Sequence, residues 1–416
     1  MRVLLIAVNS ERINMRVLPL GLAEVAAAAR RAGHEALLLD LGPGDDPAAT
    51  IARAWAAAPP DVVGLSVRNI DNVDMRRTRF LLPLAAAAVA GCRAAGAAPI
   101  VVGGAGYSIF PRAALERLGA DYGVRGEGEV AFPALLDAIA RGGDAAAIPG
   151  VFVRGGGDSA PARSADLDRF PAAEFAAWRD AAADPELLVP VQTRRGCAMD
   201  CAYCSTALIE GRALRFRSVA QVARDLAAVA DAGFRRVFFV DNVFNEPEAY
   251  ALELCRAMSA LKAPLEFRAI VYPKRLSPEL ARAMAAAGCV ETSLGFESGD
   301  PGVLRALGKR FSPDEVRAVS DALAERGVRR RGFLLLGGPG ETMETVARSL
   351  DFAASLKLDA LKTTVGIRIY PGTPLAAVAL REGVVAPGED LLEPRFYLSP
   401  ALRDRLDELP PPDPLP

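Results

Sequence analysis

Three cysteines lie close together in the segment Thr193-Arg-Arg-Gly-Cys197-Ala-Met-Asp-Cys201-Ala-Tyr-Cys204. Thiolates at this C-x3-C-x2-C spacing can close around a cuboidal iron–sulfur cluster from a single loop, because Cys thiolates are the usual ligands of such clusters. A [4Fe-4S] cluster held in this way has one iron without a cysteine ligand. An open iron of this kind is what a substrate or a cofactor needs in order to bind the cluster directly.

A zinc site and a chance grouping are the alternatives for these cysteines. Zinc normally takes four ligands, and the chain has a single histidine, His34, with no fourth cysteine near the segment. Three of six cysteines within eight residues is an improbable chance outcome. The spacing therefore predicts a [4Fe-4S] cluster. We interpret the remaining cysteines as buried small hydrophobic residues in apolar helical patterns; they are Cys92, Cys255 and Cys289.

Composition describes an ordinary globular chain that is long enough for two domains. Of its 416 residues, 51% are hydrophobic and 24% are charged, and the net charge of −2 gives no reason to expect nucleic acid or an anionic membrane as partner. The first residues, MRVLLIAV, favour a β-strand over a signal peptide, and the stretch Phe80–Cys92 is too short to span a membrane. We therefore expect a cytoplasmic protein whose cysteines serve metal or redox chemistry.

The first 150 residues alternate apolar strands with Ala-rich helices such as Leu22–Arg31 and Thr78–Ala94. This pattern is typical of a parallel sheet covered on both faces, so residues 1–150 are predicted to form an α/β, doubly wound, Rossmann-like domain. Its ligand should lie beyond the carboxyl ends of the strands. Residues 151–187 have weak periodicity and are predicted to form a hairpin and a linker. The predicted strands are Val3–Val8, Ala36–Leu39, Val62–Val67, Ile100–Val102 and Tyr122–Val124.

Strand–helix alternation resumes at residue 188. Ser218 is a plausible helix N-cap, followed by apolar residues at helical spacing as far as Gly233. Residues 188–375 are predicted to form a partial (β/α)6 barrel, in which chemistry lies on the loops after the strands. Residues 376–416 form a C-terminal extension. The predicted strands are Val237–Val240, Leu265–Val271, Val290–Phe296, Gly332–Leu336 and Thr363–Ile369.

The cysteine loop, with aromatic Tyr203 just before its last cysteine, resembles the signature of the radical S-adenosylmethionine (SAM) superfamily. The resemblance implies that the open iron chelates the amino and carboxylate groups of SAM, and that reductive cleavage yields a 5′-deoxyadenosyl radical. An electron donor such as flavodoxin or ferredoxin is then required. Tyr203 is expected near the adenine.

Residues at later strand ends match further SAM contacts of that superfamily. Asp241 is expected near the SAM amino group, and Ser293 and Glu297 near the ribose and carboxylate. Gly337 and Gly338 could let the backbone approach the nucleoside. Each also has a plain structural interpretation, since Asp241 could cap a helix and the glycines could form a tight turn.

A doubly wound domain ahead of such a barrel resembles the cobalamin-binding radical SAM subfamily, which includes the tryptophan C2-methyltransferase of thiopeptide biosynthesis. Three loops at strand ends carry the resemblance, together with the motifs Gln192-Thr-Arg-Arg-Gly-Cys, Ile209-Glu-Gly-Arg212 and Ile369-Tyr-Pro-Gly-Thr373. Glycines at strand ends allow a bulky ligand close to the backbone. The residues expected to bind cobalamin are Ser66, Val67, Arg68, Asn69, Gly103, Gly104, Gly126, Glu127 and Gly128.

The Asp-x-His-x-x-Gly motif that supplies a cobalt ligand in many cobalamin proteins is missing. The corresponding first loop, Asn9–Pro19, has no histidine, and His34 precedes the second strand at the edge opposite the expected ligand. Cobalamin is therefore expected to bind without a histidine ligand. Arg68 is the candidate for the lower face of cobalt, because a guanidinium has no lone pair to donate. The alternative for Arg68 is a salt bridge with Asp71 or Asp74.

The resemblance implies a cobalamin-dependent methyltransferase. It would move a methyl group from SAM via methylcobalamin to an unactivated carbon, or to phosphorus, of a small-molecule or peptide-derived substrate. A second interpretation keeps both cofactors but performs oxidative cyclisation or rearrangement. A third is a non-catalytic iron–sulfur or cobalamin carrier. Arg268, Tyr272 and Tyr370 are expected near the substrate, although each could equally contact SAM or pack structurally.

Overall fold

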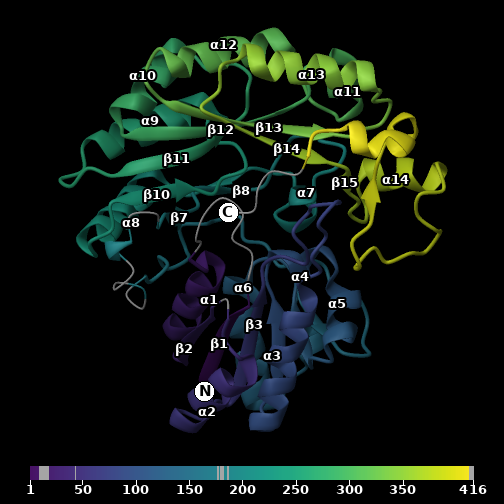
Figure 1. Cartoon of the computed structure of the whole chain (residues 1–416). Helices are drawn as coiled ribbons and strands as arrows, with labels where there is room; N and C mark the ends of the chain where they lie inside the picture. The colour runs from purple at the N-terminus through teal and green to yellow at the C-terminus, as the bar shows by residue number, and fades with distance from the viewer. Residues whose placement is uncertain (9–17, 43, 176–177, 179–181, 185–186, 412–416) are drawn as a thin grey trace.

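The computed structural model describes residues 1–8, 18–42, 44–175, 178, 182–184 and 187–411. Two α/β halves lie one against the other, each built around its own sheet (Figure 1). The first sheet has the strand order β2-β1-β3-β4-β5-β6. Its strands are β1 (Arg2–Val8), β2 (Glu35–Leu41), β3 (Val62–Val67), β4 (Ile100–Gly103), β5 (Tyr122–Val124) and β6 (Val151–Val153).

The order of the first sheet confirms a doubly wound domain. Its first five strands are parallel and follow the flavodoxin-like order, so the chain reverses direction across the sheet between β1 and β3, where such folds bind ligands. One face is covered by α1 (Leu20–Arg31) and α6 (Gly128–Arg141). The other face is covered by α2 (Pro47–Ala57), α3 (Leu82–Ala95), α4 (Ala105–Ile109) and α5 (Pro111–Leu118).

Strand β6 pairs antiparallel with β5 and extends the first sheet past residue 150. The sequence predicted a separate hairpin from residue 151, but backbone pairing of Val151 with Val124 places this segment in the first half. The partner of such a strand depends on contacts that local periodicity does not report. The first sheet therefore gains a sixth strand, which lies just past the predicted domain boundary at residue 150.

The second sheet is parallel and has the order β14-β13-β12-β11-β10-β7, so its two edge strands are not paired with each other. This is the predicted partial barrel. Helices α9 (Glu248–Ser259), α10 (Pro278–Ala286), α12 (Pro313–Ala324) and α13 (Met343–Ser355) cover its outer face, and the opposite face is turned toward the first half (Figure 1). The strands are β7 (Val189–Val191), β10 (Arg236–Phe239), β11 (Glu266–Val271), β12 (Cys289–Glu297), β13 (Arg329–Leu336) and β14 (Ala360–Val365).

Shorter elements connect this sheet to the rest of the chain. Ser218 caps α8 (Val219–Asp231) as predicted, accepting a hydrogen bond from the Gln221 amide at 3.2 Å. The predicted strand Thr363–Ile369 is broken at Gly366 into β14 and β15. The remaining elements are β8 (Arg194–Arg195), α7 (Thr206–Ile209), β9 (Arg215–Phe216), α11 (Pro301–Ala306), β15 (Ile367–Arg368), α14 (Pro374–Arg381) and β16 (Phe396–Tyr397).

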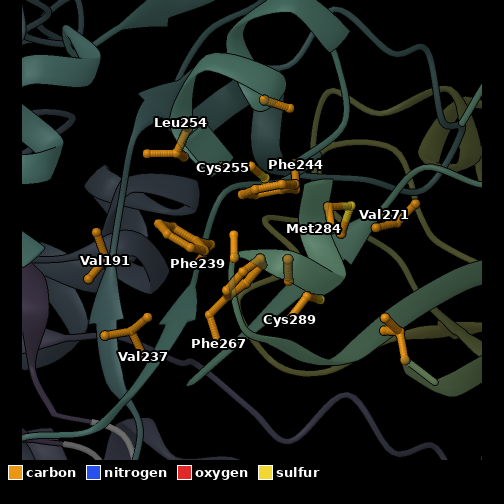
Figure 2. Packing of buried hydrophobic residues seen from close by; sticks show 14 of the residues in the cluster. Val191, Val237, Phe239, Phe244, Leu254, Cys255, Phe267, Val271, Met284 and Cys289 are labelled. Atoms are coloured by element: carbon orange, nitrogen blue, oxygen red, sulfur yellow. The ribbon is translucent and has the colours of Figure 1, made fainter. Parts of the chain in front are cut away.

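Aromatic rings fill the space between the second sheet and its helices. Phe239, Phe244 and Phe267 are fully buried, with ring centroids 5.3–5.6 Å apart (Figure 2). Cys255 and Cys289 pack in the same cluster, and Cys92 is buried in the first half, which confirms their role as small hydrophobic residues. Cys289, however, opens strand β12 and does not belong to a helix.

Buried contacts join the two halves. Arg368 of β15 donates a 2.7 Å hydrogen bond to Asp71, which follows β3, and both side chains are almost completely buried. One continuous apolar cluster contains residues of both halves, including Val67 and Ile367. The two sheets therefore hold a fixed relation to each other. Among the described residues, no helix combines the length and the apolar character needed to cross a membrane.

We predict that Phe267→Ala lowers the free energy of unfolding by about 3–5 kcal/mol, because the cavity left among Phe239 and Phe244 cannot collapse fully. Leu380→Ala is the matched control, since Leu380 is 45% exposed on α14 and its loss should change stability by about 0.5 kcal/mol or less. Urea unfolding followed by circular dichroism measures both. Equal midpoints for the two variants would contradict this packing.

Candidate functional site

The three cysteines of the motif lie on one loop between β8 and α7. Cys197, Cys201 and Cys204 are half-buried, whereas the other three cysteines are fully buried. Backbone hydrogen bonds hold the loop on two sides, from the Cys197 amide to Gly211 (3.0 Å) and from the Ala202 amide to Leu307 (2.9 Å). The loop is thus fixed in place and keeps its thiols accessible.

The donor set of this loop fits a cluster better than a single ion. Among the described residues, no three His, Cys, Asp or Glu side chains gather closely enough to hold one metal ion. Zinc draws four ligands to one centre, whereas each thiolate of a cuboidal cluster binds a different iron and can stand farther from the others. The geometry therefore disfavours the zinc alternative.

Tyr203, Glu297 and Lys309 form a half-buried group beside the cysteines. Glu297 accepts hydrogen bonds from the Tyr203 hydroxyl (2.9 Å) and the Lys309 ammonium (3.2 Å). A β-bulge re-aims Glu297 at the end of β12, and its φ of 61° is unusual for a residue other than glycine. Burial alone lowers the pKa of Lys309, but Glu297 and Tyr203 raise it well above its usual value. Sequence reasoning found Tyr203 and Glu297 but missed Lys309.

Asp241 does not face a ligand site, contrary to the expectation of a SAM contact. The carboxylate is fully buried and accepts hydrogen bonds from the Thr193 amide (2.7 Å), the Thr193 hydroxyl (2.6 Å) and the Arg194 amide (3.2 Å). Burial raises its pKa, and Arg194 opposes that shift. Asp241 instead fixes the backbone that leads into the cysteine loop.

The neighbouring Asn242 connects this loop to the wall between the halves. Its amide group donates to Glu210 at 2.8 Å, and its carbonyl accepts from Thr206 at 3.3 Å. Thr206 in turn lies 3.2 Å from the Cys204 sulfur. Glu210 also accepts from the Gly196 amide at 3.0 Å, next to Cys197. Sequence reasoning assigned no role to Glu210, which holds both ends of the cysteine loop.

Gly337 and Gly338 do not offer their amides to a ligand. Both amides donate to the Glu341 carboxylate, at 3.0 Å in the case of Gly338. Burial raises the pKa of Glu341 to about 7, while these amides lower it. The glycines therefore form the tight turn that was the alternative interpretation. Ser293 lies half-buried on the inner face of β12, two positions from Gly295.

A cavity of about 330 Å³ lies between the two halves at the carboxyl ends of β1, β3, β4 and β5. The second half contributes Gln192, Arg195 and Glu210 to its wall. Val67 and Asn69 are not part of the wall, since Val67 packs in the core. The predicted cobalamin-binding residues that line the cavity are Ser66, Arg68, Gly103, Gly104, Gly126, Glu127 and Gly128.

The backbone conformation of the cavity wall requires two of its glycines, Gly104 and Gly126. Gly104 has a φ of 102°, and a Cβ there would lie 2.6 Å from the Val67 carbonyl oxygen. Gly126 has a φ of 91°, and a Cβ there would lie 2.5 Å from the Ala162 carbonyl oxygen. We expected these glycines to admit a ligand, but their first role is to let strand ends pack closely.

Arg68 is exposed on the cavity wall. The two carboxylates considered as its partners bond elsewhere, because Asp71 pairs with Arg368 and Asp74 lies 3.2 Å from Arg77. Among the described residues the cavity wall contains no histidine. Most of the first loop, residues 9–17, lies outside the described residues.

His34 lies at the opposite edge of the first sheet, as predicted. Its ring is buried beside the Met1 amino group at 3.4 Å, and Asp137 of α6 lies 3.8 Å away. Burial and the Met1 ammonium lower the pKa of His34, and Asp137 opposes them. This histidine therefore packs structurally.

Arg195 crosses from the cysteine loop into the first half. Its guanidinium bonds Glu129 and lies 3.0 Å from Glu24 and 3.7 Å from Glu127. Burial raises the pKa of Glu24 from its ordinary value of 4.5 to about 7, with Arg195 opposing and Glu129 reinforcing the shift. Burial acts in the same direction on Glu129, but Arg195 outweighs it and lowers that pKa. Glu24 therefore keeps its proton to a higher pH than Glu129 does.

The three residues expected near the substrate occupy different places. Tyr272 is buried, accepts from the Arg310 amide at 3.1 Å and packs against a neighbouring ring, so it has a structural role. Arg268 lies on the inner face of β11, 3.8 Å from Glu291. Tyr370 lies where the halves meet, with its ring centroid 5.1 Å from the Arg368 guanidinium carbon.

Family comparisons match both halves. A model described as the radical SAM superfamily matches residues 191–353, and one described as the B12 binding domain matches residues 7–136. The first contains the cysteine loop and the second contains the strand ends that line the cavity. The chain combines a radical SAM domain with a B12 binding domain.

This B12-binding radical SAM chain is similar to known methyltransferases. An uncharacterized methyltransferase of Pyrococcus horikoshii is 26% identical over 398 residues, which cover 92% of this chain and 84% of the relative. The tryptophan 2-C-methyltransferase of Streptomyces laurentii is 28% identical over 444 residues, which cover 89% of this chain and 73% of the relative. The methyltransferase TsrM from Kitasatospora setae has been solved with tryptophan and a SAM analog bound. That structure matches this chain with a TM-score of 0.85 at 25% identity, and the match covers 97% of this chain and 86% of TsrM.

We predict that Glu24→Gln stabilises the protein at pH 8 but not at pH 5. The folded state keeps a proton on Glu24 that the unfolded chain releases above about pH 4.5, so this group reduces stability as pH rises toward 7. The full difference is on the order of 2–3 kcal/mol. Thermal melting from pH 5 to pH 8 measures it, with Glu253→Gln on the surface of α9 as control. A stability difference between Glu24→Gln and the wild-type protein that does not change with pH would contradict the raised pKa of Glu24.

Proposed function

We propose that this chain is a cobalamin-dependent radical SAM methyltransferase that methylates an unactivated carbon, or phosphorus, of a small-molecule or peptide-derived substrate. The observation that carries the proposal is the meeting of the cysteine loop and the cavity. Arg195 and Glu210 belong to the cavity wall, and both are bonded to the segment that carries the cysteines. When bound, SAM supplies the methyl group, cobalamin accepts it and passes it on, and the cluster supplies electrons.

Different residues would hold each cofactor. Cys197, Cys201 and Cys204 would bind the cluster. The half-buried face formed by Tyr203, Ser293, Glu297 and Lys309 is suited to SAM, because an ammonium and a carboxylate lie side by side there and can complement the charged amino-acid part of SAM. Asp241, Gly337 and Gly338 would support this face from behind without touching SAM.

The cavity wall would hold cobalamin without a protein ligand to cobalt. Arg68 is the residue that we place at the lower face, where a guanidinium keeps its positive charge and offers no lone pair. Ser66 and the carbonyls of the glycine-rich strand ends can accept hydrogen bonds from cobalamin amides. Glu127, which lies 3.7 Å from Arg195, would link that wall to the cysteine loop.

The site lies between the two halves, where residues of both contribute to its wall. Tyr370 lies at this junction and is the substrate-facing candidate that we retain. The TsrM structure contains tryptophan as substrate, and a small aromatic or peptide-derived molecule is compatible with the same junction here. We further propose that the chain acts in the reducing cytoplasm, where free thiols persist, with flavodoxin or ferredoxin as electron donor.

The test uses protein reconstituted without oxygen with iron, sulfide and hydroxocobalamin. We expect bound cobalamin, and S-adenosylhomocysteine after addition of SAM and reductant. Cys201→Ala should abolish the cluster absorbance and SAM consumption, because two thiolates cannot retain the cluster. Cys92→Ala is the matched control and should retain both, since Cys92 is buried in the first half.

Two results would overturn the proposal. Failure of the reconstituted protein to retain cobalamin would remove the role of the cavity. Formation of 5′-deoxyadenosine without S-adenosylhomocysteine would favour rearrangement or ring closure over methyl transfer.

A further inference from the structure

The inner face of the second sheet is open to solvent along the strands. Along β11, β12 and β13, most residues that face the helices are buried, whereas inward-facing residues such as Ile270, Ser293 and Leu335 are half-buried. A closed barrel fills its interior with such side chains and buries them. The inward residues include Ile270 of β11, Ser293 and Gly295 of β12, and Phe333 and Leu335 of β13.

Three arginines surround one carboxylate at the amino-terminal end of this inner face. Glu291 of β12 lies 3.2 Å from Arg331, 3.6 Å from Arg329 and 3.8 Å from Arg268. Its side chain is 10% exposed, and those of the arginines are 21–54% exposed. We call the three arginines and Glu291 the basic floor.

The basic floor has more positive charge than its own carboxylate can neutralise. The Nε of Arg268 is buried and makes no hydrogen bond to any described residue. A structural ion pair would be balanced, because uncompensated charge that is partly removed from water is costly. Guanidinium groups match the planar geometry of carboxylate and phosphate oxygens.

The basic floor and the cysteine loop lie at opposite ends of one strand. Glu291, Ser293 and Gly295 follow one another on the inner face of β12, and Glu297 reaches Tyr203 at the far end. Six residues of strand span about 20 Å. A molecule that reacts beside the cysteine loop and reaches the floor must therefore be elongated.

We propose that the basic floor binds an oxyanion, a phosphate or a carboxylate, at the far end of an elongated substrate. Ser293 is small and leaves room for the middle of that molecule, whereas the Glu297 carboxylate lies over Gly295. This inference rests on the proposed function only in placing the reacting carbon near the cysteine loop. The floor itself is a binding site whether or not methyl transfer occurs.

The test is calorimetric titration of the reconstituted full-length protein with inorganic phosphate and, separately, with succinate. Arg331→Gln should weaken binding of the preferred anion about tenfold, because the anion loses hydrogen bonds to one charged guanidinium. Arg330→Gln is the matched control, because Arg330 lies on the opposite face beside Asp359 and Ser320. It should leave the affinity unchanged.

Glu291→Gln provides the decisive second variant. It removes the carboxylate that competes for the arginines, so anion binding should become several-fold tighter than in the wild-type protein. Circular dichroism melts confirm that each variant is folded. Absence of phosphate and succinate binding by the wild-type protein, or unchanged affinity in Glu291→Gln, would overturn the inference. Because no SAM is added, either result is independent of methyl transfer.

Discussion

The buried guanidinium of Arg195 is the contact on which the site depends. It belongs to β8, two residues before Cys197, and its charge lies among Glu24, Glu127 and Glu129 of the first half. Separating the halves would leave these acids and the arginine partly buried without partners, which costs several kcal/mol. The same contact therefore holds the cysteine loop at the strand ends of the first sheet.

Strand β12 organises the other side of the site. It begins in the aromatic core at Cys289, carries Glu291 at the basic floor and ends in the bulge that aims Glu297 at Tyr203. A residue other than glycine at a φ of 61° persists only where surrounding contacts hold it, and such positions cluster at functional sites. Here those contacts are the Tyr203 hydroxyl and the Lys309 ammonium. Strand β12 thus connects the basic floor at one end with the residues beside the cysteine loop at the other.

Local patterns were enough to predict the two sheets and the cysteine loop. Buried parallel strands have continuous apolar runs, and the three thiols lie within one loop, so neither depends on distant contacts. The contacts of the site residues were harder to predict from the sequence. Asp241 lies at a strand end as predicted, but the direction of its side chain depends on the Thr193 amide, which belongs to the connection between β7 and β8. The sequence around Lys309 does not distinguish it from a lysine on the surface, and only the fold brings its ammonium to Glu297.

The central claim is that an iron–sulfur cluster on the cysteine loop and cobalamin in the cavity lie close together across one interface. Electron paramagnetic resonance of protein carrying both the reduced cluster and cob(II)alamin tests this most directly. We expect a magnetic interaction that broadens both signals and speeds their relaxation, together with a cobalt spectrum that lacks nitrogen splitting. Two independent, unbroadened signals, or a cobalt signal split by a histidine nitrogen, would contradict it.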